Sequence, residues 1–413
     1  MKKRNIKLRT IFIFLFSFVA IAATKQDIYR KIKDSQRTIN NVYKYLITHY
    51  VDDIDLEKFT KMSIDNMLSD LDPYTVYLVD DQKSGLDMLT SGQYGGVGIQ
   101  IGKRDNVITV IAPTDDSPAK RAGIMAGDVL IKIDGEDTES MSMDDAAKLI
   151  RGKKGSSVVL TIERFNEEEP IDFTLTREDI PVKDVSYFGM LDESIGYIRL
   201  TRFSKNSADE VEKAIFSLKS NALSSIVLDL RDNPGGLLNS AVSILDMFIE
   251  KDELLVWTDG KARQSSKKYY SKSDPIVSDD IQIAVLINGG SASASEIVAG
   301  VMQDLDRGVV VGRQSFGKGL VQTVYNIDRN KALKVTTAKY YIPSGRLIQK
   351  SGYLPEEILA DTTEADSLFE TVGGRIVKGG KGITPDYVVE SDDRIDRKST
   401  RLNSSHRCIS YAV

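Results

Sequence analysis

IQIAVLINGGSASASEIVAGVMQDL, residues 281–305, is the stretch that decides the fold of this chain. Its first seven residues are a continuous apolar run rich in β-branched side chains, which indicates a buried strand in a parallel sheet. Asn288, Gly289 and Gly290 then favour a turn. From Ser293 onward the apolar residues recur at helical spacing. The stretch therefore predicts a strand, a tight turn and a helix, with a serine where the helix begins.

Ser293 has two interpretations at this junction. The free backbone N–H groups of a helix N-terminus suit an oxyanion, so a serine there is well placed for chemistry. Serine is also a favoured N-cap, and caps are the commoner case. The stretch alone does not choose between a catalytic serine and a capping serine, so the rest of the chain has to decide.

The alternation of strand and helix extends upstream from this stretch to Ile195. IGYIRLTRF and SSIVLDL predict strands, SADEVEKAIFSLK and LLNSAVSILDMFI predict helices, and their order indicates an α/β layered domain. Ligands bind such sheets beyond the carboxyl ends of the strands. The turns DNPGG (232–236) and NGGSAS (288–293) both follow predicted strands, so we expect functional residues in both.

A β-rich module precedes the α/β domain. It opens with YGGVGIQIG from Tyr94, continues through AGDVLIKIDG, and has one predicted helix, Met143 to Ile150. From Tyr94 to about Glu178 this order resembles a PDZ domain, a module that binds C-terminal peptides by adding a strand to its sheet edge. The alternative is that its glycines only make a turn. The resemblance implies that a backbone loop binds the peptide carboxylate; its residues are Gly95, Gly96, Val97, Gly98 and Ile99.

The two ends of the chain are set apart from the fold. Residues 1–23 are basic, then apolar, then small, which is the pattern of a secretory signal; an uncleaved membrane anchor is the alternative. Residues 397–413 change composition abruptly and resemble translated sequencing-adapter sequence, so we treat them as a non-native tail. This tail holds Cys408, the single cysteine, so no disulfide is expected. We expect an exported protein.

Composition excludes several classes of function. The chain carries 60 acidic and 55 basic residues in a mixed pattern, which gives no nucleic-acid footprint. It has no phosphate-binding or dinucleotide glycine motif. The two histidines are His49, in a predicted helix, and His406, in the tail, so neither a histidine-based triad nor a usual zinc site is available. An activated serine would need another base, and lysine is the known substitute.

GRQSFGKGLVQTVY, residues 312–325, supplies a candidate base. Lys318 lies between two glycines after Phe316, and burial in an apolar pocket would lower its pKa from about 10.4 toward neutrality. At strand period Gln322 shares a face with Lys318 and could orient the amine. The alternative is a solvated lysine in a glycine loop.

Five motifs, taken in their order along the chain, favour a catalytic Ser293 and a basic Lys318 because together they resemble those of a known family. DLRDNPGGLL, NGGSASASEIVAG, FGKGLVQ, YYIPSGRLIQ and GITPDYVVE are similar to the motif set of the tail-specific, or C-terminal processing, proteases, over about residues 40–390. The resemblance implies a serine endopeptidase with a Ser-Lys dyad, an acyl-enzyme and no metal or cofactor. It implies Ser293 as nucleophile, Lys318 as general base and Gln322 as its orienter. The N–H of Ala294 would form half of the oxyanion hole, and Gly235 or Gly236 the other half.

The sequence thus predicts a multidomain chain of mixed α/β and α+β class. A helical segment (24–85) precedes the PDZ domain (90–180) and the protease core (181–390). The expected partners are proteins or peptides with apolar C-termini, with a homo-oligomer or an activating partner left open. The expected compartment is the periplasm, or the outside of the cytoplasmic membrane where there is only one membrane. The competing hypothesis is a non-catalytic exported PDZ scaffold.

Overall fold

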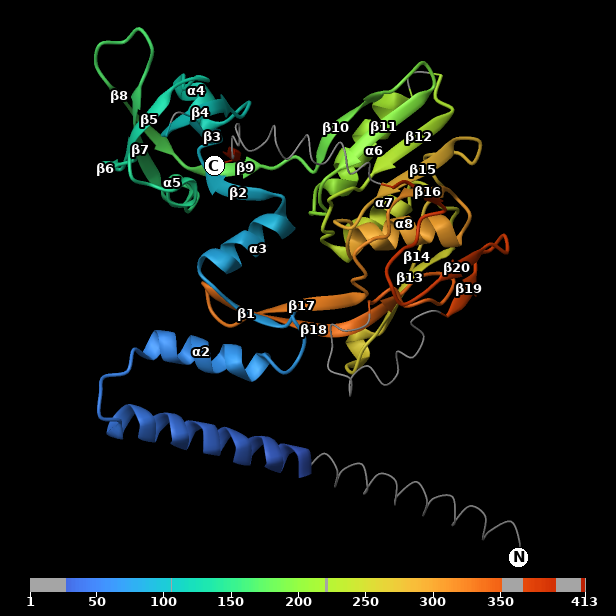
Figure 1. Cartoon of the computed structure of the whole chain (residues 1–413), viewed down its shortest axis with the longest axis horizontal. Helices are drawn as coiled ribbons and strands as arrows, with labels where there is room; N and C mark the ends of the chain where they lie inside the picture. The colour runs from blue at the N-terminus through green and yellow to red at the C-terminus, as the bar shows by residue number, and fades with distance from the viewer. Residues whose placement is uncertain (1–26, 105, 220–221, 351–366, 391–409, 413) are drawn as a thin grey trace, which may run out of the picture. The chain divides into compact units, whose positions relative to one another are not determined.

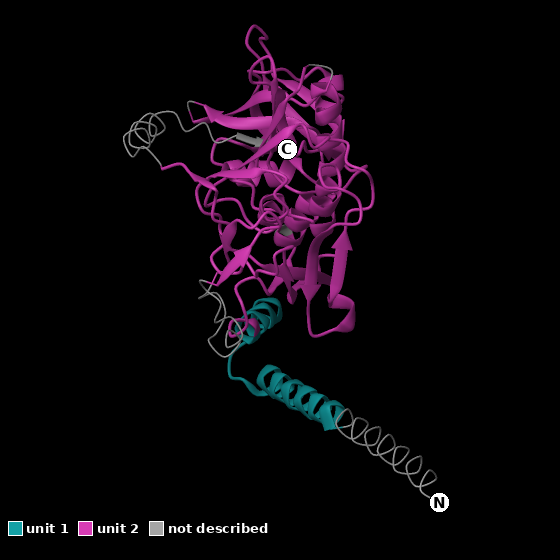
Figure 2. Cartoon of the chain, turned by 90° about the vertical axis from the view of Figure 1, so that its right-hand side faces the viewer, with its two compact units in different colours: residues 1–67 teal, residues 68–413 magenta. Residues whose placement is uncertain are grey.

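The computed structural model describes residues 27–104, 106–219, 222–350, 367–390 and 410–412. The predicted signal, and the predicted tail apart from 410–412, lie outside these residues. The chain divides into two compact units, Met1–Met67 and Leu68–Val413, which Figure 2 colours separately. None of the described helices is both long enough and apolar enough to cross a membrane.

The described residues of the first unit are mostly helical, as predicted. A helix covers residues 27–49, and α2 (Leu56–Leu68) follows it. The two helices contact each other through Tyr43, whose ring centroid lies 5.8 Å from that of Phe59 and whose hydroxyl shares a 2.9 Å hydrogen bond with Thr60. The predicted end of the helical segment, at residue 85, lies beyond the division between the units. Residues 68–85 belong to the second unit, which has β1 (Val76–Val79) and α3 (Asp81–Ser91) near its start.

The PDZ-like module has its own hydrophobic core. Ile99, Ile133, Ile150 and Leu160 are fully buried within it and belong to one cluster. The predicted helix is present at the predicted bounds as α5, and a five-residue helix, α4, is added. The elements are β2 (Gln93–Gly96), β3 (Ile99–Arg104), β4 (Val107–Pro113), α4 (Pro118–Ala122), β5 (Val129–Ile133), β6 (Glu136–Asp137), α5 (Met143–Ile150), β7 (Ser157–Glu163), β8 (Ile171–Thr176) and β9 (Glu178–Pro181).

A six-stranded sheet forms the centre of the α/β domain, in the order β10-β11-β12-β15-β16-β21. All neighbours are parallel except β10 with β11. Fully buried positions alternate with partly exposed ones along β11, β12 and β15, so one face of this sheet is enclosed more completely than the other. The strands are β10 (Val185–Met190), β11 (Ile195–Leu200), β12 (Ser225–Asp229), β15 (Gln282–Ile287), β16 (Val309–Gly312) and β21 (Tyr387–Val388).

A second, antiparallel sheet contains elements from distant parts of the chain (Figure 1). The segment ELLVWTDG, which follows the strand–helix alternation in sequence, joins this sheet rather than the parallel one. Its Trp257 pairs with Tyr341, and the two rings stack with centroids 5.0 Å apart. The strands are β1, β13 (Leu254–Asp259), β14 (Lys267–Tyr270), β17 (Leu320–Asn326) and β18 (Lys331–Tyr341); β19 (Leu368–Glu370) and β20 (Ile376–Lys378) form a separate pair.

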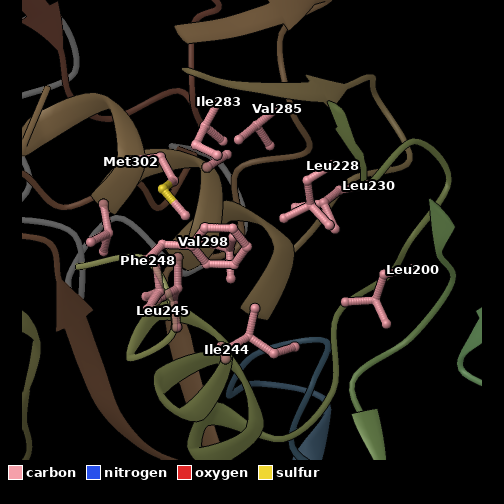
Figure 3. Packing of buried hydrophobic residues seen from close by; sticks show 14 of the residues in the cluster. Leu200, Leu228, Leu230, Ile244, Leu245, Phe248, Ile283, Val285, Val298 and Met302 are labelled. Atoms are coloured by element: carbon pink, nitrogen blue, oxygen red, sulfur yellow. The ribbon is translucent and has the colours of Figure 1, made fainter. Parts of the chain in front are cut away.

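Three helices, α6 (Ser207–Leu218), α7 (Leu238–Leu245) and α8 (Ala294–Asp304), cover the parallel sheet. α8 contacts β15 and β16 of the parallel sheet and β13 of the antiparallel sheet, and it packs on α7. Every residue of α8 is buried as a result, which is expected for a helix enclosed on all sides. Figure 3 shows Val298 and Met302 of α8 among Leu245 and Phe248 and the strand residue Val285. This packing fixes the helix whose N-terminus carries Ser293.

Candidate active site

The two predicted functional turns meet at the carboxyl edge of the parallel sheet. β12 and β15 are parallel neighbours, so the turns that follow them lie side by side. The N–H of Ala292 donates to the carbonyl oxygen of Asn233 at 3.0 Å, and the hydroxyl of Ser295 donates to the same oxygen at 2.9 Å. The DNPGG turn is therefore fastened to the turn that carries Ser293.

Ser293 has a strained backbone. Its φ is 56° and its ψ is −112°, a conformation in which side chains other than glycine are uncommon. It is the N-cap residue of α8 and is half-buried between two fully enclosed neighbours, Ala292 and Ala294. The turn thus presents a partly accessible serine at the positive end of a buried helix dipole.

The glycines of DNPGG approach this serine closely. A Cβ atom at Gly235 would lie 2.9 Å from both the Ser293 Cβ and the Ala294 nitrogen, so only glycine fits. The N–H of Gly235 donates to Asn233 Oδ1 at 2.9 Å. Within the described part of the chain, the N–H groups of Gly236 and Ala294 have no acceptor. Two unused donors therefore flank the serine.

Glu296, in the first turn of α8, joins the serine turn to the lysine loop. Its side chain is fully buried. Oε2 accepts the N–H of Ser293 at 2.7 Å and that of Lys318 at 2.9 Å. Oε1 accepts the hydroxyl of Ser315 at 2.5 Å and the N–H of Gly317 at 2.6 Å. Burial raises the pKa of Glu296, while these four donors oppose that shift.

Tyr340, on β18, makes a second connection between the same two segments. Its hydroxyl lies 3.1 Å from the carbonyl oxygen of Ser293 and 2.5 Å from that of Lys318, and it donates toward both. The ring is fully enclosed, and burial raises the pKa of Tyr340 well above its usual value, so it stays protonated. The backbones of Ser293 and Lys318 are therefore linked by two independent sets of hydrogen bonds, one through Glu296 and one through Tyr340.

The Lys318 amine lies in a partly apolar environment. Its Nζ is 4.7 Å from the centre of the Tyr74 ring. Burial lowers the pKa of Lys318 to about 8; the charge of Lys334 adds to this effect, while Glu296 and Asp72 oppose it. A lysine with this pKa has a substantial neutral fraction near neutral pH, which a general base requires.

The segment before β1 places Tyr74 and Asp72 beside this lysine. The Asp72 carboxylate accepts the backbone N–H of Tyr74 at 2.9 Å and the hydroxyl of Thr75 at 2.7 Å. It also accepts the hydroxyl of Thr336 on β18 at 2.9 Å. The segment LDPYT (residues 71–75) is thereby attached to the sheet that carries Tyr340 and Lys334.

Gln322 lies on β17, which begins at Leu320, so Lys318 is in the loop before the strand. The pairing with β18 shifts register between Val321 and Gln322. The Gln322 side-chain nitrogen is 3.5 Å from Thr336 Oγ1, at the limit of a hydrogen bond. The proposed orientation of the Lys318 amine by Gln322 stays a prediction.

The predicted carboxylate loop of the PDZ module divides between a strand and a turn. Gly95 and Gly96 belong to β2 and pair with β9, while Ile99 opens β3. Only Val97 and Gly98 lie outside strands, and among the described residues their N–H groups have no acceptor. Gly98 has a φ of 74°, and a Cβ there would lie 2.3 Å from that of Ser117.

The adjacent sheet edge accepts an added strand. β22 (Ser410–Ala412) pairs antiparallel with β3, with Ala412 opposite Gln100 and Ser410 opposite Gly102. β22 also contacts α5. An extended segment thus lies along the edge at which PDZ domains take their peptides.

Two site residues were not singled out in the sequence. Glu296 stands three residues after Ser293, and Ser-x-x-Glu before an apolar run is the signature of a capping box. That pattern could have identified it. Tyr340 opens the quoted motif YYIPSGRLIQ, but nothing in that motif shows that its hydroxyl reaches the carbonyl oxygens of Ser293 and Lys318 from a different sheet. The described residues contain no cluster of three or more His, Cys, Asp or Glu able to hold a metal.

Comparison with known proteins identifies the family. Residues 194–359 match the model of peptidase family S41, and residues 109–164 match the PDZ domain. The carboxy-terminal-processing protease of Bartonella bacilliformis is 40% identical over 323 residues, covering 77% of this chain and 74% of that protein. A probable CtpA-like serine protease of Staphylococcus aureus strain N315 is 35% identical over 363 residues, covering 87% and 72%.

Among solved structures, the photosystem II D1 C-terminal processing protease is 27% identical, and the match covers 85% of this chain and 86% of that one with a TM-score of 0.45. The sequence relatives confirm the predicted enzyme class and speak against the non-catalytic scaffold. The chain belongs to the carboxy-terminal-processing proteases, serine peptidases of family S41 that carry a PDZ domain.

Proposed function

We propose that this chain is an exported endopeptidase that selects substrates by their C-terminal tails and cleaves them with Ser293 as nucleophile and Lys318 as general base. The observation that carries the proposal is the double connection between the two segments. Glu296 binds the N–H groups of both Ser293 and Lys318, and Tyr340 contacts both carbonyl oxygens. A strained serine and a lysine with a lowered pKa are thereby kept adjacent.

The reaction follows from these two groups. Neutral Lys318 takes the proton from the Ser293 hydroxyl as its oxygen bonds to the carbonyl carbon of the substrate peptide. The tetrahedral oxyanion is bound by the N–H of Ala294 and a second N–H from the DNPGG turn. Protonated Lys318 then gives its proton to the leaving amine as the C–N bond breaks. Water, deprotonated by the same lysine, attacks the ester and releases the new carboxyl group.

Gly236 is the better candidate for the second oxyanion donor. The N–H of Gly235 already donates to Asn233 Oδ1, whereas that of Gly236 has no acceptor in the described chain. Gly235 then serves a different purpose, because its missing side chain lets the DNPGG turn approach Ser293 and Ala294. Gln322 completes the proposed base by orienting the Lys318 amine.

Tail recognition is assigned to the PDZ module. The turn N–H groups of Val97 and Gly98 would bind the carboxylate of a substrate tail. The tail itself would lie along β3, where β22 is an example of an added strand. Export rests on the basic, apolar and small pattern of residues 1–23. Membrane retention through that segment, self-association and an activating partner are questions for experiment.

The test uses residues 25–396 and the same chain with Ser293→Ala. Each is incubated with a protein that ends in an apolar tail, and mass spectrometry follows the products. We expect Ser293→Ala to lower kcat by a factor on the order of 10⁶. Ser295→Ala is the matched control on the same helix turn, and we expect it to lose less than about tenfold, because the N–H of Ala292 still donates to the Asn233 carbonyl oxygen that the Ser295 hydroxyl would no longer contact.

Amidation of the substrate's C-terminus separates tail recognition from chemistry. The proposal expects tail-dependent cleavage by the wild type and none by Ser293→Ala. Comparable turnover by the two chains would move the nucleophile elsewhere. Equal cleavage of free-acid and amidated substrates would remove the PDZ part of the proposal and leave the dyad untouched.

A further inference from the structure

Glu296 accepts more hydrogen bonds than a glutamate at this helix position needs for capping. In a capping box the side chain at this position reaches back to the N–H of the cap residue, here Ser293. Three of the four donors to Glu296 instead belong to residues 315–318, the loop that carries the base. Capping of α8 alone does not require hydrogen bonds from the lysine loop to this carboxylate. The arrangement is a bridge between two segments distant in sequence.

The lysine loop depends on such a bridge because it has no regular structure. Residues 313–319 lie between β16 and β17 and belong to neither. Helical or strand hydrogen bonds therefore cannot fix Lys318. Other tertiary hydrogen bonds hold residues on both sides of Lys318, such as that of the Phe316 N–H to the Ser291 carbonyl oxygen at 3.0 Å and that of the Gly319 N–H to Gln349 Oε1 at 2.9 Å. Among the described residues, only Glu296 and Tyr340 hydrogen-bond to the backbone of Lys318 itself and also to the backbone of Ser293.

The hydrogen bonds also define the charge state of Glu296. Each carboxylate oxygen accepts two donors, and three of the four are backbone N–H groups that can only donate. No ion pair to Glu296 exists among the described residues, so its negative charge is balanced by neutral dipoles rather than by a cation. A protonated carboxyl would lose one of these acceptor positions.

We propose that Glu296 is a positioning residue whose buried carboxylate, assisted by the Tyr340 hydroxyl, holds the Lys318 loop against the Ser293 turn so that the base meets the nucleophile. This inference rests on the proposed dyad. Glu296 does not touch the substrate or take part in proton transfer. It acts through the backbones of Ser293 and Lys318, and it acts on the lysine amine through its charge.

The groups that act on the Lys318 amine come from three elements. Lys334, on β18, disfavours its protonation, while Asp72, in the turn before β1, and Glu296, on α8, favour it. Tyr74 offers its ring face, and Tyr340 is held protonated by burial. Removing the charge of Glu296 while leaving the others in place should therefore lower the pKa of Lys318 further.

The experiment compares Glu296→Gln, Glu296→Asp and Tyr340→Phe in the full chain by kcat, KM and the pH profile of kcat/KM on a tailed substrate. Glutamine keeps the size of glutamate but replaces one acceptor by a donor and removes the charge. We expect Glu296→Gln to reduce kcat on the order of 10- to 100-fold, with KM changed less than about threefold, because misplacement of a reacting group costs this much. The acid limb of its kcat/KM profile should move to lower pH, because the pKa of Lys318 should be lower in this variant.

Tyr340→Phe is the matched control, because it loosens the same two backbones without changing a charge. We expect kcat to fall while the acid limb stays where the wild type has it. Glu296→Asp keeps the charge on a shorter stem, so it should also lower kcat and leave the acid limb in place. A residue with only a structural role would not move the acid limb in one variant and spare it in the other two.

Wild-type kcat and an unmoved acid limb in Glu296→Gln would overturn the proposal. If Glu296→Gln fails to fold, as thermal melts would show, Glu296→Asp and Tyr340→Phe decide: wild-type kcat in both overturns it. Ser293→Ala in the same assay distinguishes a failure of the proposed dyad from a failure of the proposed role of Glu296. Turnover by Ser293→Ala would refute the dyad, whereas an inactive Ser293→Ala beside an unaffected Glu296→Gln would refute only the role of Glu296.

Discussion

Ser293 and Lys318 are held in place in opposite ways. Ser293 lies at the end of a regular strand–turn–helix unit, and α8 is enclosed by two sheets. Lys318 lies in a loop without regular structure, and its own backbone is held by one hydrogen bond to Glu296 and one from Tyr340. The comparison teaches that the nucleophile is positioned by packing and the base by polar contacts. Small changes should therefore disturb the base more readily than the serine.

After Ser293→Ala, the largest effect in this comparison is expected at Lys318 itself. Lys318→Arg keeps a positive charge but cannot give up its proton, and Lys318→Met keeps only the apolar stem. We expect both to lower kcat by roughly 10²- to 10⁴-fold, the range of general-base catalysis. Steady-state kinetics on a tailed substrate measures this.

Lys267→Arg, an exposed residue on β14, is the matched control and should keep wild-type kcat. Activity of Lys318→Arg within tenfold of the wild type would mean that another group takes the proton from the serine.

An intermediate effect is expected on the nucleophile side, at Gly235. Its φ is 94°, and an added Cβ would lie 2.6 Å from the Ala292 carbonyl oxygen and 2.9 Å from the Ala294 nitrogen. Gly235→Ala should therefore push the DNPGG turn away from Ser293 and lower kcat by about 10²- to 10³-fold, the scale of a lost oxyanion donor.

Gly289→Ala tests the neighbouring turn, where an added Cβ meets nothing within 4 Å. It should keep the activity of the wild type. Equal activity of the Gly235 and Gly289 variants would contradict the close approach of the two turns.

The smallest effect is a pH dependence of stability from the base. Burial lowers the pKa of Lys318 to about 8, below the value of about 10.4 expected in the unfolded chain. Between these two values the unfolded chain binds the proton more readily than the folded one, so the free energy of unfolding should rise with pH across this window. Below about pH 8 both states are protonated, and the cost of burying the charged lysine is present in full.

Urea unfolding at about pH 7.5 and pH 10 measures this effect, with Lys318→Met as the reference. Burial also lowers the pKa of Lys334, which contributes the same sign in both chains. The wild type should gain stability relative to Lys318→Met as pH rises. An identical pH dependence in the two chains would mean that the amine is not desolvated.

The contrast between the regular unit that carries Ser293 and the irregular loop that carries Lys318 also explains how much the sequence could predict. The strand and helix expected within residues 281–305 are present as β15 and α8, because apolar runs and periodicity are local signals. The PDZ helix was likewise predicted at its observed bounds. The meeting of Tyr340, Glu296 and Asp72 at Lys318 was not predictable, because these residues come from three separate segments of the chain. The pairing of β13 with β18 was hidden for the same reason.

The most direct test of the account is to trap the acyl-enzyme. Wild type and Ser293→Ala would be mixed with an activated ester substrate, for which hydrolysis of the acyl-enzyme limits turnover, and quenched in acid within the first turnover. Peptide mapping by mass spectrometry then locates the adduct. The account predicts an acyl group on Ser293, forming faster as pH rises through about 8, and none on Ser293→Ala. An adduct on another residue, or turnover of the ester by Ser293→Ala, would contradict it.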